Sequence, residues 1–471
     1  MLPGRRVARA ISFLLMRFLP TLGAVGPFQR AWLWQAGLYL SFWAELRLFT
    51  DLRLNYGPFL NPVLFYGSSV LMCVFAALYW LDRPMAPADA ERTSRRFPLA
   101  WIGLLLGAVQ VIYVQAPVIA SQPIDVRSSD IIPILQADVG RFRAGEVVYR
   151  YITTLPYPLF PNHLPLQWLP YVPADQLGID YRWWALGILL LVGFGAYQAT
   201  LARQPLGLVN FLLKVALPAY VLYRLISRDG QLYAHPVEPT IIAYYCILAA
   251  SVLSRSALLQ GVALVLCLLS RYSVVFWVPF YLWVLWREEG RRHALLVAGL
   301  VLAGIMGIYV VPFLSKDWTI FTHALSEYRI STLGEWGRTD GNGGLPPQLF
   351  GGVGLAAWFF TYGPEDLNAR ISLIQAADAL LSIGAVLLAA GVYYYFRHRF
   401  DYRIFALIAL KFYLATFYAF IQTPYAYLES LGLFISVFVV MMTGAGLATT
   451  TPRADKLAPA AVPPLVPATA A

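Results

Sequence analysis

The sequence predicts an all-α polytopic membrane protein. Of its 471 residues, 59% are hydrophobic and only 13% are charged, which lies outside the composition of soluble globular proteins. Apolar windows recur along the chain at the length that crosses a bilayer as a helix, and they predict about twelve transmembrane helices. Because a helix satisfies its backbone polar groups without water, a helical bundle is favoured over a barrel.

The net charge of +10 is also typical of proteins that bind nucleic acid. Most arginines, however, lie in short connectors between apolar runs, where they set the orientation of membrane spans. We therefore expect membrane lipids as surroundings and no nucleic-acid partner. Cys73, Cys246 and Cys267 lie inside apolar runs without metal-ligand spacing, and we expect them in the core.

Residues 1–97 are predicted to form a membrane-surface amphipathic segment followed by a transmembrane hairpin. The N-terminus is basic and has no small-residue cleavage site, and Arg17 interrupts its apolar run. The hairpin is expected at 31–49 and 59–81. Residues 448–471 are rich in Ala, Pro and Thr and are predicted to form a disordered cytoplasmic tail.

The remaining apolar windows predict crossings at 98–120, 183–200, 206–226, 240–253, 257–286, 293–314, 372–396, 404–421 and 427–443. The window 257–286 is too long for one crossing, and Ser270-Arg271-Tyr272-Ser273 interrupts it. We predict two short helices that meet near the outer face, because an arginine at mid-depth is costly without a partner or a water-filled cavity. An even number of crossings places both termini in the cytoplasm, in agreement with the arginines at both ends.

Two long polar segments, 121–181 and 315–371, fall on the same non-cytoplasmic side. Long loops of this kind are usually functional, so we expect the site on that face. In a bacterium it would be the outer face of the cytoplasmic (inner) membrane, towards the periplasm or the cell exterior. An activated substrate there would have to be carried by a lipid, and Arg271 is placed to meet a lipid phosphate.

The first polar segment contains a predicted surface helix, Ile131–Arg143, with apolar residues on one face: Ile131, Ile134, Leu135 and Val139. Asp130 begins this helix, where free backbone N–H groups stabilise a carboxylate. Asp130 is therefore either an N-cap or a catalytic residue, and spacing alone leaves both open. Asp138, about two helical turns further on, is the rival carboxylate.

The order Asp130, surface helix, Ala144-Gly145, Tyr149 and aromatic-proline turns resembles the first outer loop of the GT-C superfamily of integral-membrane glycosyltransferases. The likeness is closest to the bacterial branch that uses polyprenyl-phosphate sugars, which includes the polyprenol-phosphate-mannose mannosyltransferases. It covers roughly 98–443 and implies a GT-C-like transmembrane core, 98–447, with surface helices in a large first outer loop.

The resemblance implies an inverting glycosyltransferase that moves a sugar from a polyprenyl-phosphate donor to a lipid- or glycan-linked acceptor of the cell envelope. Asp130 would act as general base on the acceptor hydroxyl. Arg271, between two short helices, would stabilise the leaving phosphate, with Tyr272 and Tyr149 in the substrate site. The loop lacks an Asp-X-Asp motif, so no metal or other cofactor is expected.

Other polar residues of the outer face are candidates for sugar contacts: His163, His235, Glu238, His323, Glu335 and Trp336, whose ring could stack on a sugar. The three histidines could in principle bind zinc, but their wide separation favours ordinary hydrogen bonding. Tyr425 and Tyr427 lie at an outer helix end, where they either anchor the helix at the interface or line the cavity.

Within the spans, Lys214, Asp378 and Lys411 are the costly charges, and Lys411 could pair with Asp378. A membrane transporter or lipid flippase is the alternative function, with Arg271, Asp378 and Lys411 as a polar path. Inverted repeats with paired broken helices would indicate a transporter, and only one break is visible. An O-antigen-ligase-like enzyme would need a dense arginine cluster, which 316–370 lacks.

Overall fold

The computed structural model describes residues 27–51, 55–82, 101–204, 208–399 and 401–443. These residues are mainly helical, and the β-structure among them is one isolated bridge between Ile152 and Leu159. Seven of the described helices are long and apolar enough to cross a membrane, and three shorter apolar helices accompany them. The chain is therefore a multi-pass membrane protein. The N-terminal surface segment and the disordered tail that we predict lie outside the described residues.

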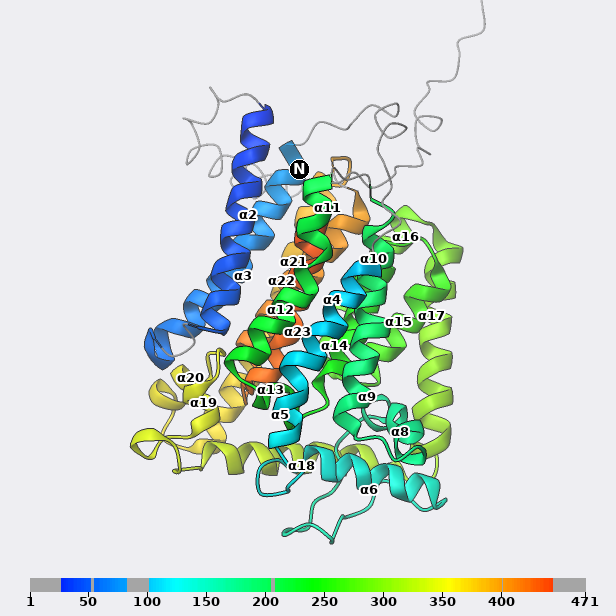
Figure 1. Ribbon diagram of the computed structural model, residues 1–471, viewed down its shortest axis with the longest axis vertical. Helices are drawn as coiled ribbons and strands as arrows, with labels where there is room; N and C mark the ends of the chain where they lie inside the picture. The colour runs from blue at the N-terminus through cyan, green and yellow to red at the C-terminus, as the bar shows by residue number, and fades with distance from the viewer. Residues whose placement is uncertain (1–26, 52–54, 83–100, 205–207, 400, 444–471) are drawn as a thin grey trace, which may run out of the picture.

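The seven long helices, the three shorter apolar ones, α2 and α16 run side by side in one bundle (Figure 1). They are α2 (Pro27–Phe49), α3 (Gly57–Asp82), α4 to α5 (Ile102–Ser121), α9 to α10 (Tyr181–Leu201), α11 and α12 (Leu208–Arg228), α14 (Glu238–Val252), α15 (Ala257–Leu268), α16 (Trp277–Glu288), α17 and its π-helical continuation (Arg291–Leu314), α21 (Leu367–Phe396), α22 (Tyr402–Ala419) and α23 (Ala426–Met441). Nearly every residue of α14, α22 and α23 is buried. These three helices form the centre, where a helix is apolar on all sides.

Two helices lie across one end of the bundle, at the bottom of Figure 1: α6 (Ile131–Arg143) and α18 (Thr319–Trp336). The helix predicted over 131–143 is confirmed, and the face predicted to be apolar is mostly buried. The sequence did not predict α18, because only three of its residues are buried and no apolar face marks it. Two short helices follow it, α19 (Pro347–Gly351) and α20 (Ala356–Tyr362).

A buried ion pair holds the α2–α3 hairpin against the rest of the bundle. Lys411 of α22 contacts the carboxylate of Glu45 of α2, and the two side chains are 1% and 0% exposed. Ser69 of α3 and Ser436 of α23 donate hydrogen bonds of 2.6 and 2.7 Å to the same carboxylate. Four helices therefore share one polar cluster inside an apolar bundle.

The predicted pairing of Lys411 with Asp378 is wrong. Glu45 of the hairpin takes that position, and Asp378 instead accepts a hydrogen bond of 3.1 Å from Ser382, one turn along α21. The prediction considered only Lys214, Asp378 and Lys411 as intramembrane charges. It left out Glu45, which lies in the N-terminal hairpin, 366 residues from Lys411. Lys214, the other intramembrane lysine, donates to the backbone carbonyl of Met441 at 2.9 Å. Its ammonium group therefore lies at the C-terminal end of α23.

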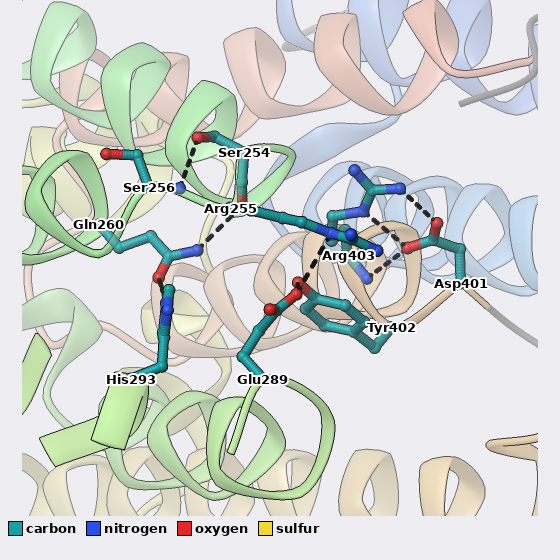
Figure 2. A network of polar contacts seen from close by, with 9 residues as sticks. All are labelled: Ser254, Arg255, Ser256, Gln260, Glu289, His293, Asp401, Tyr402 and Arg403. Carbon is teal, nitrogen blue, oxygen red and sulfur yellow. Dashed lines mark hydrogen bonds and ion pairs between the residues drawn. The ribbon is translucent and has the colours of Figure 1, made fainter. Parts of the chain in front are cut away.

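The end of the bundle away from α6 and α18 carries a polar network, shown in Figure 2. Arg255, after α14, lies 3.4 Å from Glu289, and Tyr402 at the start of α22 donates to the same carboxylate. His293 and Gln260 are joined at 2.8 Å. These contacts join the connection between α14 and α15, the connection between α16 and α17, and the start of α22. Polar side chains therefore hold the helices together at this end of the bundle.

Candidate functional site

Two adjoining cavities lie at the end of the bundle where α6 and α18 cross it. Their volumes are about 670 and 730 Å³, within the usual range of ligand-binding sites. Seven residues line both cavities: Asp130, Ile131, Tyr157, Pro236, Glu335, Tyr425 and Tyr427. The two spaces therefore meet at a junction that contains two carboxylates and three phenols.

The first cavity is largely apolar and is bordered by α6, α14, α18, α21 and the ends of α22 and α23. Its apolar lining includes Ile134, Leu135, Ile241, Phe276, Phe321, Leu325, Phe417, Ile421 and Leu428. Arg271 also lines it, from the break between α15 and α16. The predicted interruption is confirmed: Arg271 has extended backbone angles and precedes a short 3₁₀ turn, Tyr272–Val274.

Arg271 is oriented by Glu238, the first residue of α14. Two hydrogen bonds of 2.6 Å each join its Nη1 and Nη2 to the two carboxylate oxygens. Glu238 is buried and Arg271 is partly buried. A bidentate pair of this kind fixes the plane of the guanidinium, and it leaves other N–H groups for a ligand in the cavity.

Asp130 stands at the N-cap position of α6, but its side chain makes no capping hydrogen bond. Its Oδ2 instead accepts a hydrogen bond of 2.6 Å from the hydroxyl of Tyr157. A carboxylate whose main role was capping would accept from the backbone N–H groups of the first turn. The side chain of Asp130 is thus directed to the junction of the two cavities.

His163 lies close enough to both Asp130 and Arg271 for each of their charges to affect its pKa. Burial lowers the pKa of His163 to about 4, the Asp130 carboxylate opposes this shift, and the Arg271 guanidinium adds to it. The ring is therefore neutral near pH 7. Its Nδ1 is buried without a hydrogen-bond partner among the described residues, and the residue lines the first cavity.

The second cavity has a more polar lining. It is bordered by the loop before α6, by α13 (Gln231–Ala234) and by α19, and its polar residues include Arg127, Ser128, Ser129, Asp229, Gln231, His235, Arg338 and Gln348. Burial lowers the pKa of His235, and Arg182 adds to this shift. Hydroxyl, amide, imidazole and carboxylate groups of this kind are suited to a sugar chain, which both donates and accepts hydrogen bonds.

A second carboxylate, Glu335, reaches the junction from the end of α18. Arg338 pairs with it at 3.3 Å and also bonds Asp340. On the other side, Tyr425 and Tyr427 stack at a centroid distance of 5.5 Å. The carboxylate of Glu335 thus has a guanidinium beside it, whereas the carboxylate of Asp130 accepts its hydrogen bond from a phenol.

Four predicted site residues lie outside both cavities: Asp138, Tyr149, His323 and Trp336. Trp336 is 1% exposed, and its indole N–H donates to the carbonyl of Gln422. Tyr149 is buried and donates to the carbonyl of His163. His323 is exposed and contacts the ring of Phe160. The other candidates, Tyr272 and Tyr425 among them, line the first or the second cavity.

Asp138 lies on the inner face of α6 and is 0% exposed. Burial raises its pKa well above the usual range, and Arg141 opposes this only in part. Neither carboxylate oxygen has a hydrogen-bond partner among the described residues. Burial of this kind favours the neutral form of a carboxyl group. Asp138 is therefore enclosed in the protein, whereas Asp130 lines the junction of the two cavities.

Two residues that line the first cavity, Tyr157 and Tyr418, were not among the predicted site residues. Tyr418 lines the first cavity and donates to Ser273 at 3.0 Å, beside the Arg271 turn. Tyr157 lies between Pro156 and Pro158, and this aromatic-proline pattern was a signal available in the sequence. Nothing in the sequence, however, places that turn beside Asp130.

Comparison with protein-family models, with curated proteins and with solved structures gives no match for this chain. The function is therefore inferred from the two cavities and from the residues that line them.

Proposed function

We propose that the protein is an inverting glycosyltransferase that moves a sugar from a polyprenyl-phosphate donor to a lipid- or glycan-linked acceptor. The observation that carries this proposal is the meeting of an apolar cavity containing Arg271 with a polar cavity at the carboxylate of Asp130. An amphiphilic donor needs an apolar wall and a phosphate contact, and a sugar acceptor needs a polar wall. A transfer reaction requires a base where the two meet.

In the proposed reaction, an acceptor hydroxyl in the second cavity donates its proton to Asp130. The oxygen attacks the anomeric carbon of the donor sugar as the bond from that carbon to the phosphate oxygen breaks. Polyprenyl phosphate leaves with the electron pair, and the configuration at the anomeric carbon is inverted. An ordinary carboxylate suffices as base, because the hydroxyl proton becomes acidic as the new bond forms.

Arg271 is the proposed contact for the donor phosphate. Its pairing with Glu238 reduces the net charge at this point, so the phosphate would be recognised mainly through directed N–H hydrogen bonds. These bonds gain strength as charge develops on the leaving group. The neighbouring phenols of Tyr418 and Tyr427, which also line the first cavity, would complete the polar end of this apolar space.

The proposed orientation places both cavities on the outer face of a bacterial cytoplasmic membrane. The alternative function is a transporter or lipid flippase. Arg271 and Asp378 do line one cavity, but Lys411, the third charge of the supposed path, is paired with Glu45 and lines neither cavity. This arrangement favours the transferase.

The proposal is tested by a transfer assay with purified protein in nanodiscs, a panel of radiolabelled polyprenyl-phosphate sugars, and membrane-extract acceptors. We expect one donor to yield a labelled glycolipid or glycan together with free polyprenyl phosphate. The proposal fails if every donor stays intact while the protein moves a labelled lipid or solute across sealed vesicles.

Replacing Arg271 by Lys is expected to raise the KM for the donor about tenfold to a hundredfold, with a much smaller change in the KM for the acceptor. Lys keeps the charge but cannot reproduce the bidentate contact with Glu238 or the forked contact with a phosphate. Initial rates at varied donor and acceptor concentrations measure both constants. Arg255→Lys, at the opposite end of the bundle, is the control, and an unchanged donor KM in Arg271→Lys would remove this residue from the phosphate site.

A further inference from the structure

The hydrogen bond between Tyr157 and Asp130 occupies the place where an acceptor hydroxyl would be activated. At 2.6 Å, it has the length of a bond between a hydroxyl donor and a charged carboxylate. Burial raises the pKa of Tyr157, and the bond to Asp130 raises it further. The phenol is therefore a neutral donor, with the same hydrogen-bonding chemistry as a sugar hydroxyl.

The loop that carries Tyr157 is built to present this residue. The bridge between Ile152 and Leu159, with hydrogen bonds of 2.8 and 3.2 Å, closes the loop at its base. Arg141 of α6 donates to the carbonyls of Arg150 and Tyr151 at 2.6 and 2.8 Å. The loop base is thus attached to the same helix that Asp130 begins.

The tip of the loop differs from its base. Tyr157 is 43% exposed, and Pro156 and Pro158 on either side restrict the backbone to extended conformations. The side chain lines both cavities, so it can turn away from Asp130 while the bridge between Ile152 and Leu159 at the loop base stays in place.

We propose that Tyr157 is a positioning residue that keeps water from Asp130 until an acceptor hydroxyl displaces its phenol. This inference rests on the proposed function. A polyprenyl-phosphate sugar is activated for attack by any hydroxyl, and water is one. If water donated its proton to Asp130, its oxygen would attack the anomeric carbon, polyprenyl phosphate would leave, and the free sugar would be lost.

The test is Tyr157→Phe, which removes only the hydroxyl. With donor present and acceptor absent, we expect the rate of donor hydrolysis to rise about tenfold or more, the factor that corresponds to one hydrogen bond to a charged group. The ratio of hydrolysis to transfer, measured with acceptor present, should rise as well. Tyr157→Leu should show the same increase, and adding Asp130→Asn to Tyr157→Phe should abolish it.

Tyr151→Phe is the matched control. Tyr151 lies on the same loop and donates to Glu327 at 3.0 Å, but it lines neither cavity, so its partition between hydrolysis and transfer should match the wild type. The inference is overturned if the wild-type protein transfers sugar while Tyr157→Phe partitions as the wild type does. It is also overturned if the variant loses transfer and hydrolysis together. A wild-type protein that turns over no donor would instead contradict the proposed function itself.

Discussion

Replacing Asp130 by Asn is expected to lower the rate of sugar transfer by about 10² to 10⁴, the usual contribution of a general base. The change keeps the shape of the side chain and its ability to accept from Tyr157, but an amide cannot take up the acceptor proton. The measurement is the single-turnover rate of labelled product formation in nanodiscs, with donor binding measured separately. Donor binding should stay close to that of the wild type.

Asp138→Asn is the matched control for this experiment. Asp138 lies on the same helix, is 0% exposed, and has a pKa raised well above its usual range by burial. An amide resembles the neutral carboxyl group that the folded state holds there, so transfer should stay within about threefold of the wild type. Because the pKa of Asp138 is raised in the folded protein, the free energy of unfolding falls as pH rises above the ordinary pKa of an aspartate, and Asn at this position removes that loss. Strong activity in Asp130→Asn with loss in Asp138→Asn would reverse the roles of the two residues.

Replacing Lys411 by Met is expected to destabilise the protein by roughly 3 to 5 kcal/mol, because it leaves the buried carboxylate of Glu45 without its cation. Ser69 and Ser436 still donate to that carboxylate, but two hydroxyl groups do not neutralise a charge. The loss is measured as a fall in the unfolding midpoint in detergent, followed by tryptophan fluorescence. Lys316→Met, at an exposed loop lysine, should leave the midpoint unchanged.

The double variant Glu45→Gln with Lys411→Met separates pairing from packing. Removing both charges leaves no buried ion, and replacement of a whole buried pair is often neutral. We expect the double variant to regain most of the stability lost by Lys411→Met. If the two changes were additive, the residues would not interact, and the hairpin would have to be held by apolar packing alone.

The helices of the bundle could be predicted from sequence because each depends on its own composition. A run of apolar residues long enough to cross the bilayer must form a helix, whichever neighbours it has. The same holds for α6, whose apolar face repeats with the helical period, and for the break at Arg271, which is polar within an apolar window. The missed helix α18 shows the limit: with only three buried residues, it carries no such pattern.

The candidate site was predictable only in part. Asp130 and Arg271 both line the first cavity. Each could be predicted from its own segment of the sequence, Asp130 from a helix start and Arg271 from a helix break. Residues chosen only because they are polar and on the outer segments divide among the cavities, the protein interior and, for His323, the exposed surface. Trp336 and Asp138 turned out to be buried, since the face that a side chain takes on a surface helix depends on what the helix packs against.

The sequence by itself determined the membrane class, most of the helix positions, and two of the segments that line the candidate site, because hydropathy and helix breaks act over a few turns of one chain. Only the tertiary structure decided which charges meet. Lys411 pairs with Glu45, 366 residues apart in the chain, and Arg271 pairs with Glu238. It also decided that the hydroxyl of Tyr157 donates a hydrogen bond to Asp130. Such contacts depend on how distant helices pack, since a buried charge binds whichever partner the fold brings within reach.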